Sequence, residues 1–168
     1  GDLNLKKVEQ IIIDEAMNLN NVDNGSIWRM NKETGILEIV AAFGKGNKNK
    51  VIMHAGEGVA GYVYSSGNSE IINNVKDDPR YIKGENKIYS MLCSPLKTKN
   101  STLGVIIVSC ERELNYTAAN LKLFNTLASQ GAIAIENTQY MDELNRHRKH
   151  LEVLVKERTN DLAEKNVI

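Results

Sequence analysis

Apolar residues recur at helical spacing near both ends of the chain. Residues 3–19 place apolar side chains three or four positions apart, as an amphipathic helix requires. The same period runs from Thr117 to about Lys165 without a proline, and Thr117 is a suitable N-cap. A helix of this length spans roughly 70 Å at about 1.5 Å per residue, far more than a small domain needs for its own core. The pattern therefore predicts a helix at each end, the second of which leaves the domain as a rod.

Between these helices, short apolar runs alternate with clusters of turn residues. They predict strands at residues 26–30, 36–43, 51–54, 70–75, 90–97 and 103–110. A short helix is expected at 59–64, and polar loops at 44–50 and 76–85. Because short turns join successive strands, the expected fold class is α+β. It has a central antiparallel sheet of about five to six strands, with the N- and C-terminal helices on one face.

The apolar face of the C-terminal helix narrows to a seam in its second half. One heptad frame predicts a parallel homodimer whose core positions are Met141, Leu144, Arg148, Leu151, Val155 and Leu162. Run backwards, the same frame includes Leu127 and Ala134, so the part of the helix that packs on the domain is in phase with the seam. Arg148 and Arg158 at core positions weaken a short seam, so we expect micromolar association.

Charge and composition narrow the classes of partner. The chain has 168 residues, with 21 basic and 21 acidic side chains and no net charge. Without a basic excess, we expect neither nucleic acid nor direct membrane contact. No apolar run approaches the roughly 20 residues of a membrane span, and no signal peptide is visible. The expected location is cytoplasmic, either as an independent protein or as the cytosolic part of a membrane-anchored receptor.

Three patterns that could indicate binding or catalysis are interpreted as structural features instead. Residues 56–61 satisfy the dinucleotide pattern G-x-G-x-x-G, but the following helix is too short for a βαβ unit, so a tight turn is expected. His147 and His150 lie one helical turn apart among basic residues that oppose a cation, so no metal site is expected. Cys93 and Cys110 are expected to be buried thiols that are not bridged to each other, although their places in two hairpin arms leave pairing geometrically open.

A group of segments resembles, in order and spacing, the motifs of GAF domains. They are Gly56-Glu-Gly-Val-Ala-Gly-Tyr-Val63, Asp77-Asp-Pro-Arg80, Ser90-Met-Leu-Cys-Ser-Pro-Leu96, Leu103-Gly-Val105 and Leu127-Ala-Ser-Gln-Gly-Ala-Ile-Ala-Ile-Glu-Asn137. The resemblance covers residues 3–141, the expected sensory domain. Residues 142–168 resemble the coiled-coil linker that follows such domains in bacterial sensor histidine kinases, diguanylate cyclases and chemoreceptors.

The resemblance implies a small-molecule pocket on the sheet face opposite the terminal helices. Matched by position, the candidate pocket residues are Tyr62, Ile72, Asn74, Asp78, Arg80, Tyr81, Ile88, Ser90, Met91, Cys93 and Ile107. It also implies a regulatory domain, without catalytic residues of its own, that passes a conformational signal through the coiled coil to an output domain in the same polypeptide. No cofactor is predicted beyond an unidentified small molecule.

Two alternatives stay open: a ligand-free dimerisation module, and a redox enzyme of the free methionine sulfoxide reductase type, which shares the fold. Such a reductase needs a cysteine within the crossing at 73–89, which contains none. Covalent pigment is not expected, because neither cysteine precedes a histidine. The cyclic-nucleotide signature is incomplete, since Asn86-Lys87 is present but Phe124 is not followed by Asp-Glu.

Overall fold

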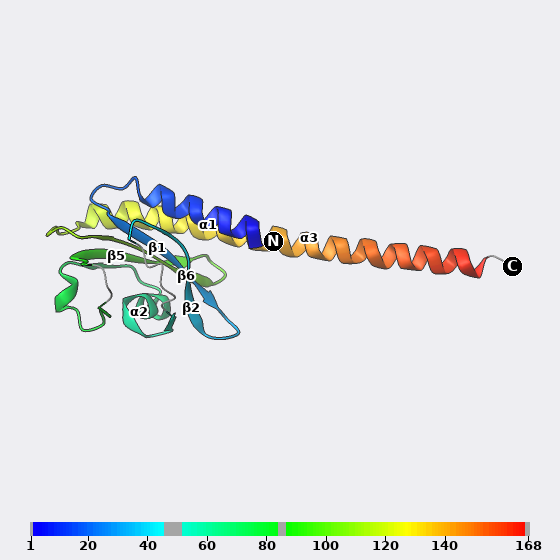
Figure 1. Cartoon of the computed structure of the whole chain (residues 1–168), viewed down its shortest axis with the longest axis horizontal. Coiled ribbons are helices and arrows are strands. Elements are labelled where there is room, and N and C mark those ends of the chain that lie inside the picture. The colour runs from blue at the N-terminus through cyan, green and yellow to red at the C-terminus, as the bar shows by residue number, and fades with distance from the viewer. Residues whose placement is uncertain (1, 46–51, 84–86, 167–168) are drawn as a thin grey trace.

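The computed structural model describes residues 2–45, 52–83 and 87–166 (Figure 1). In chain order the elements are α1 (Asp2–Ala16), β1 (Asn24–Asn31), β2 (Ile36–Phe43), β3 (Ile52–His54), α2 (Gly58–Ser66), β4 (Glu70–Ile72), the 3-10 helix η1 (Val75–Asp77), β5 (Ser90–Lys97), β6 (Thr102–Cys110) and α3 (Ala118–Lys165). The strands form one six-stranded sheet in the order β3-β2-β1-β6-β5-β4. Each neighbouring pair is antiparallel, which confirms the predicted α+β class.

α1 and the first half of α3 lie together over one face of the sheet (Figure 1). Their buried apolar residues follow the helical period and pack on the inward-facing residues of β1, β2, β5 and β6. We call this cluster the first core; its fully buried members include Ile13, Ile27, Leu96, Ile106, Phe124, Ala132 and Ile135. The two helices approach closely at Gly131, where an added Cβ would lie 2.9 Å from Cγ2 of Ile12.

A second cluster lies on the opposite face of the sheet, beneath α2. This second core consists of Trp28, Leu37, Val59, Ala60, Val63, Ile72, Val75, Met91, Cys93 and Val105. Gly61 allows α2 to begin close to the sheet, because an added Cβ would lie 2.4 Å from the carbonyl oxygen of His54. The glycine pattern at 56–61 is therefore a turn and helix start on an antiparallel sheet, as predicted.

Some element boundaries differ from prediction. α1 ends at Ala16 rather than at residue 19, and residues 17–20 form turns. β4 ends at Ile72 rather than at residue 75, because Asn74 adopts a left-handed φ of 63° and η1 follows. α2 is longer than the predicted 59–64. Residue 51 of the predicted strand, most of the predicted loop 44–50, and residues 84–85 of the crossing lie outside the described residues.

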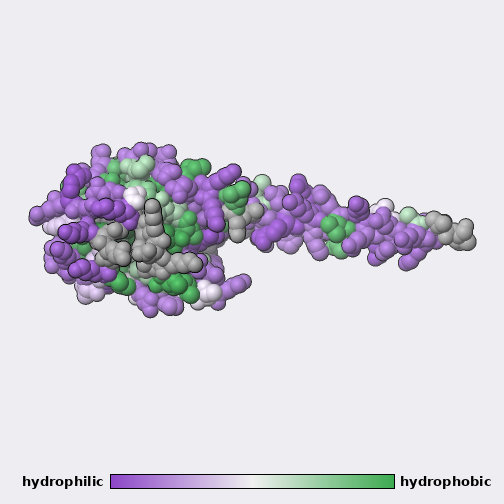
Figure 2. All heavy atoms as spheres, in the orientation of Figure 1, coloured by the Kyte–Doolittle hydropathy of each residue, from purple (hydrophilic) through white to green (hydrophobic). Residues whose placement is uncertain are grey.

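α3 is a single helix of 48 residues that continues far beyond the sheet (Figure 1). Thr117 and Asn120 form a capping box, in which each side chain bonds the backbone of the other. Ile135 is the last fully buried residue of α3, and every described residue from 143 onward is exposed. We call residues 142–165 the rod segment. Figure 2 shows isolated apolar patches on this otherwise polar segment.

Candidate functional site

Most of the predicted pocket residues lie together on the second-core face. Ile72, Met91 and Cys93 are buried members of the second core. The half-buried side chains of Tyr81, Ile88 and Ile107 pack against it. These residues come from β4, β5, β6 and the segment between β4 and β5, so the structure assembles one packed apolar cluster from segments far apart in sequence.

Arg80 links β4, α2 and the segment after β4 beside this cluster. Its Nε and Nη2 donate to the two carboxylate oxygens of Asp78 over 3.0 and 2.7 Å. Its Nη1 donates to Oε2 of Glu70 on β4 over 2.6 Å. The guanidinium carbon also lies 4.4 Å from the ring centroid of Tyr62 on α2, within cation–π range. The segment after β4 is thereby fastened to β4 and to α2.

The Arg80 cluster perturbs the ionisation of its members. The hydrogen bonds from Arg80 lower the pKa of Asp78. The bonds to Asp78 and Glu70 raise the pKa of Arg80, which therefore stays cationic. Burial, followed by the nearby Glu70 carboxylate, raises the pKa of the Cys93 thiol. A thiol that is buried and protonated is a poor nucleophile, so Cys93 acts here as a small apolar side chain.

Two of the predicted pocket residues, Asn74 and Ser90, make structural hydrogen bonds elsewhere. Asn74 donates from Nδ2 to Asp77 over 2.7 Å, which stabilises the loop and gives Asp77 a structural partner. Ser90 lies on the other face of the sheet, where its hydroxyl donates to the carbonyl oxygen of Leu114. Its ladder partner Cys110 belongs to the first core. The structure therefore does not bring Ser90 together with the predicted pocket residues.

The two cysteines are free and fully buried on opposite faces of the sheet. Cys93 pairs with Ile107 in the second core, whereas Cys110 pairs with Ser90 and belongs to the first core. The expectation that they could approach as hairpin neighbours is wrong, because strand side chains alternate between faces and these two point apart.

Sequence reasoning missed two contributors to this face. Trp28 on β1 is a buried member of the second core, and its indole nitrogen donates to Ser26 over 2.9 Å. Glu70 is an ion-pair partner of Arg80. Glu70 is a charged residue at the start of the apolar strand β4, which indicated an ion pair. Its partner, Arg80, could not be predicted from the strand alone.

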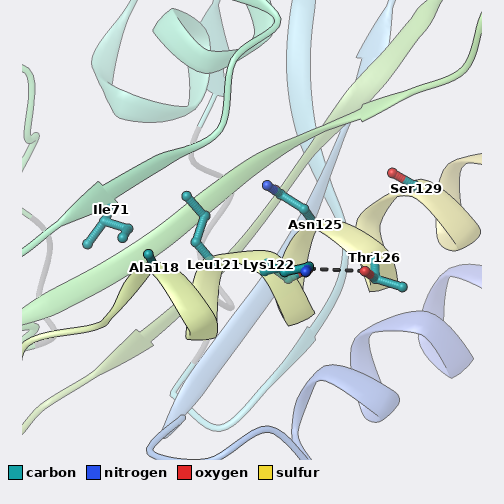
Figure 3. A pocket seen from close by; sticks show the side chains of 7 residues that line it. All are labelled: Ile71, Ala118, Leu121, Lys122, Asn125, Thr126 and Ser129. Atoms are coloured by element: carbon teal, nitrogen blue, oxygen red, sulfur yellow. Dashed lines mark hydrogen bonds between the residues drawn. The ribbon is translucent and has the colours of Figure 1, made fainter.

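An open hollow of about 400 Å³ lies beside α3 on the helix-covered side of the sheet (Figure 3). It is lined by Ile71, Ala118, Leu121, Lys122, Asn125, Thr126 and Ser129. Asn125 also ties α3 to the sheet, because its Oδ1 accepts from the hydroxyls of Ser69 and Ser94 over 2.5 and 3.0 Å. None of the predicted pocket residues lines this hollow.

The predicted seam residues are exposed in the single chain. Met141, Leu144, Leu151, Val155 and Leu162 are between 56% and 64% exposed. Arg148 forms an ion pair within its own helix, where its Nε lies 3.7 Å from Oε1 of Glu152. Nearer the domain, the large apolar side chains of Leu123, Ile133 and Tyr140 are also more than half exposed. α3 therefore carries unpartnered apolar surface along its whole length.

In the part of the chain that the structure describes, no group of three or more His, Cys, Asp or Glu side chains could hold a metal ion. His147 lies 3.9 Å from Glu143 on the same helix face. No described helix combines the length and apolarity needed to cross a bilayer.

The fold and the sequence together define the class of protein. A family model of the GAF domain matches residues 2–136, so the chain belongs to the GAF domain family. The resemblance seen in the sequence is thereby confirmed, as is the expected fold. A comparison with curated proteins found no match.

Solved structures share the fold at low identity. The GAF domain of an Acinetobacter phosphoenolpyruvate-protein phosphotransferase is 21% identical, with a TM-score of 0.72 over 81% of this chain and 84% of that one. The GAF domain of a two-component sensor histidine kinase from Bacillus halodurans is 16% identical, with a TM-score of 0.67 over 81% and 96%. A type II free methionine-R-sulfoxide reductase from Thermoplasma acidophilum is 15% identical, with a TM-score of 0.69 over 79% and 96%.

Proposed function

We propose that the chain is a regulatory sensory domain that pairs with a second copy of itself and passes a conformational change along α3. A small molecule binds on the second-core face, and the output domain lies in the same polypeptide. The domain itself performs no catalysis. Membership of the GAF family supports this proposal. The output that we favour is a two-component histidine kinase, by analogy with the Bacillus halodurans protein of the same fold.

The observation that carries the proposal is the rod segment. Leu144, Leu151, Val155 and Leu162 lie at core positions of one heptad frame, yet a single chain leaves each of them more than half exposed. A helix with no tertiary packing of its own is stabilised when such a seam is buried against a partner. A second copy of the chain presents the same seam in the same frame, so a parallel dimer buries it symmetrically.

The second-core face supports the ligand part of the proposal. Its residues come from the strands of a rigid sheet, from α2 and from the segment that crosses between β4 and β5. Irregular segments held on a rigid sheet are where proteins commonly bind small molecules. The Arg80 cluster fastens the segment after β4 over that face. A ligand that loosens or tightens this segment can shift a two-state equilibrium by its difference in affinity for the two states.

Native mass spectrometry of the 168-residue chain tests both parts together. We expect a dimer that dissociates on dilution, with a small molecule retained in part of the population. Leu151→Glu should give monomers, whereas Glu157→Ala, outside the seam, should not. A dimer that never retains a small molecule, even after incubation with metabolite extracts, would favour the ligand-free dimerisation module. A monomer at high concentration would overturn the proposal.

The redox alternative lacks support from the thiols. Cys93 and Cys110 are both fully buried and lie on opposite faces of the sheet. Thiol–disulfide chemistry needs an accessible thiolate with a second thiol within reach. The likeness to the Thermoplasma reductase is a likeness of fold at 15% identity.

A further inference from the structure

The turn between β5 and β6 contacts α3 close to the point where the helix leaves the domain. Glu136 follows Ile135, the last fully buried residue of α3. Its Oε2 accepts from the hydroxyl of Thr98 over 2.6 Å, and its Oε1 accepts from Nδ2 of Asn100 over 3.1 Å. Both carboxylate oxygens are therefore bonded to one turn, which restrains the helix in rotation as well as in position.

Thr98 also holds the turn itself in shape. Its Oγ1 accepts from the backbone N–H groups of Asn100 and Ser101 over 3.2 and 3.3 Å. Its backbone N–H donates to the carbonyl oxygen of Ser101 over 2.9 Å. The carbonyl oxygen of Ser101 lies 3.4 Å from the same hydroxyl, so the contact with Glu136 is much the shorter of its two donor contacts, and the two acceptor positions serve the turn. A change in the turn conformation therefore moves the Thr98 hydroxyl that is bonded to the Glu136 carboxylate.

The strand that leads into this turn faces both cores. On β5, Met91 and Cys93 belong to the second core, whereas Leu92 and Leu96 belong to the first core beneath α3. A displacement of β5 from the second-core side therefore reaches α3 at two polar ties. One tie is Ser94 to Asn125, and the other is the turn to Glu136. Of the two, the tie at Glu136 is nearer to the rod segment by eleven residues, roughly 16 Å of helix.

We propose that Glu136 is a positioning residue that fixes the direction and phase in which the rod segment leaves the domain. Through Thr98 and Asn100 it couples the β5–β6 turn to that direction. The inference rests on the proposed role of α3 as the path to the output. Glu136 is a member of neither the second core nor the predicted seam, and it connects the β5–β6 turn to α3 just before the rod segment.

The test measures the direction of the rod within one chain. Spin labels are placed on exposed cysteines introduced at Lys32, in the β1–β2 turn, and at Lys156, on the rod segment. The labelled chain is diluted with excess unlabelled chain, so that only intramolecular distances contribute. Pulsed electron paramagnetic resonance (double electron–electron resonance) should give one narrow distribution of label-to-label distances for the parent chain. Glu136→Ala should broaden the distribution and shift its centre, and Glu136→Gln should broaden it less because an acceptor remains.

Two matched variants separate the proposal from a general loosening of the domain. Asn125→Ala removes the other tie between α3 and β5, and Glu143→Ala removes an exposed carboxylate about two turns beyond Glu136. Both should keep the width of the parent distribution. If Glu136→Ala fails to fold, Asn100→Ala removes only one of the two bonds from an exposed turn residue and should still broaden the distribution.

A folded Glu136→Ala or Asn100→Ala chain with the parent distance distribution would overturn the proposal. Circular dichroism and the thermal midpoint establish that each variant is folded. Because the labels report on one chain, this result does not depend on whether the chain forms a dimer. Failure of the proposed dimer and failure of the Glu136 link are therefore distinguishable.

Discussion

The two halves of α3 share one helical period but differ in what covers them. In the first half, Phe124, Ala128, Ala132 and Ile135 are almost completely buried in the first core. In the rod segment, Leu151 and Val155 are 59% and 64% exposed. In the seam frame, however, these four buried residues do not occupy core positions. α3 therefore packs one apolar face on the sheet and carries a different, unpartnered apolar seam beyond it. This difference allows the two halves to be tested by matched substitutions.

The largest expected effect is in the first half. Phe124→Ala should lower the free energy of unfolding by about 3–5 kcal/mol, because it empties a fully buried aromatic site in the first core. Leu151→Ala should leave the unfolding of the isolated monomer nearly unchanged. Urea denaturation at concentrations where the chain is monomeric measures both. Equal losses for the two variants would contradict the division of the helix.

For dimer association, the rod segment should matter more than the first half of α3. Leu151→Ala should weaken dimer association by about 2 kcal/mol, roughly a thirtyfold rise in Kd, because it removes a large side chain from the centre of the seam. Ser129→Ala, beside the hollow in the first half, is the control and should leave association unchanged. Sedimentation equilibrium over a range of concentrations gives both constants.

A smaller effect is expected where α1 meets α3. Gly131→Ala places a methyl group 2.9 Å from Cγ2 of Ile12 and should cost about 1–3 kcal/mol through overpacking. Helix propensity offsets about 1 kcal/mol of that cost, so the net loss should be modest. Asn137→Ala is the control in the same helix, and it should be neutral or slightly stabilising. A stabilised Gly131→Ala chain would show that the two helices do not pack closely.

The smallest effect depends on pH and lies at the Arg80 cluster. The pKa of Asp78 is lower in the folded chain than its unfolded value near 3.9, chiefly through hydrogen bonds from Arg80. Its stabilising contribution is therefore complete above about pH 4 and is lost as the pH falls through the folded pKa. Asp78→Asn should flatten the loss of stability between neutral and acidic pH, measured as urea midpoints.

Asp161→Asn, which alters an exposed carboxylate of the rod segment, is the matched control for that profile. It should follow the parent curve. If Asp78→Asn also follows the parent curve, the ion pair with Arg80 contributes nothing measurable to folding.

The sequence predicted the elements better than their ends and contacts. Thr117 and the unbroken period beyond it predicted α3, and the turns at 31–35 and 98–102 predicted both hairpins. The end of β4 was missed because a polar residue with a left-handed φ, Asn74, is not marked by glycine or proline. Directly after it, the backbone N–H of Val75 donates to the carbonyl oxygen of Tyr89 over 2.7 Å, a long-range bond that spacing along the chain does not predict.

The candidate site was predicted in part. Strand alternation agrees with placing Met91 and Cys93 on one face, and the same alternation would have placed Ser90 on the other. Matching residues to the GAF family by sequence position placed Ser90 in the pocket without regard to the face of β5 on which it lies. The ties made by Glu70 and Glu136 could not be predicted, because their partners are set by tertiary packing rather than by spacing along the chain.

Disulfide cross-linking between copies tests most directly the claim that the rod segment is the seam of a parallel dimer. A cysteine introduced at Leu151 should form a covalent dimer rapidly under mild oxidation, because core positions of a parallel, in-register pair face each other. Glu157→Cys, on the outer face of the same segment, should react far more slowly. Equal rates at the two positions, or no covalent dimer at Leu151, would contradict the account.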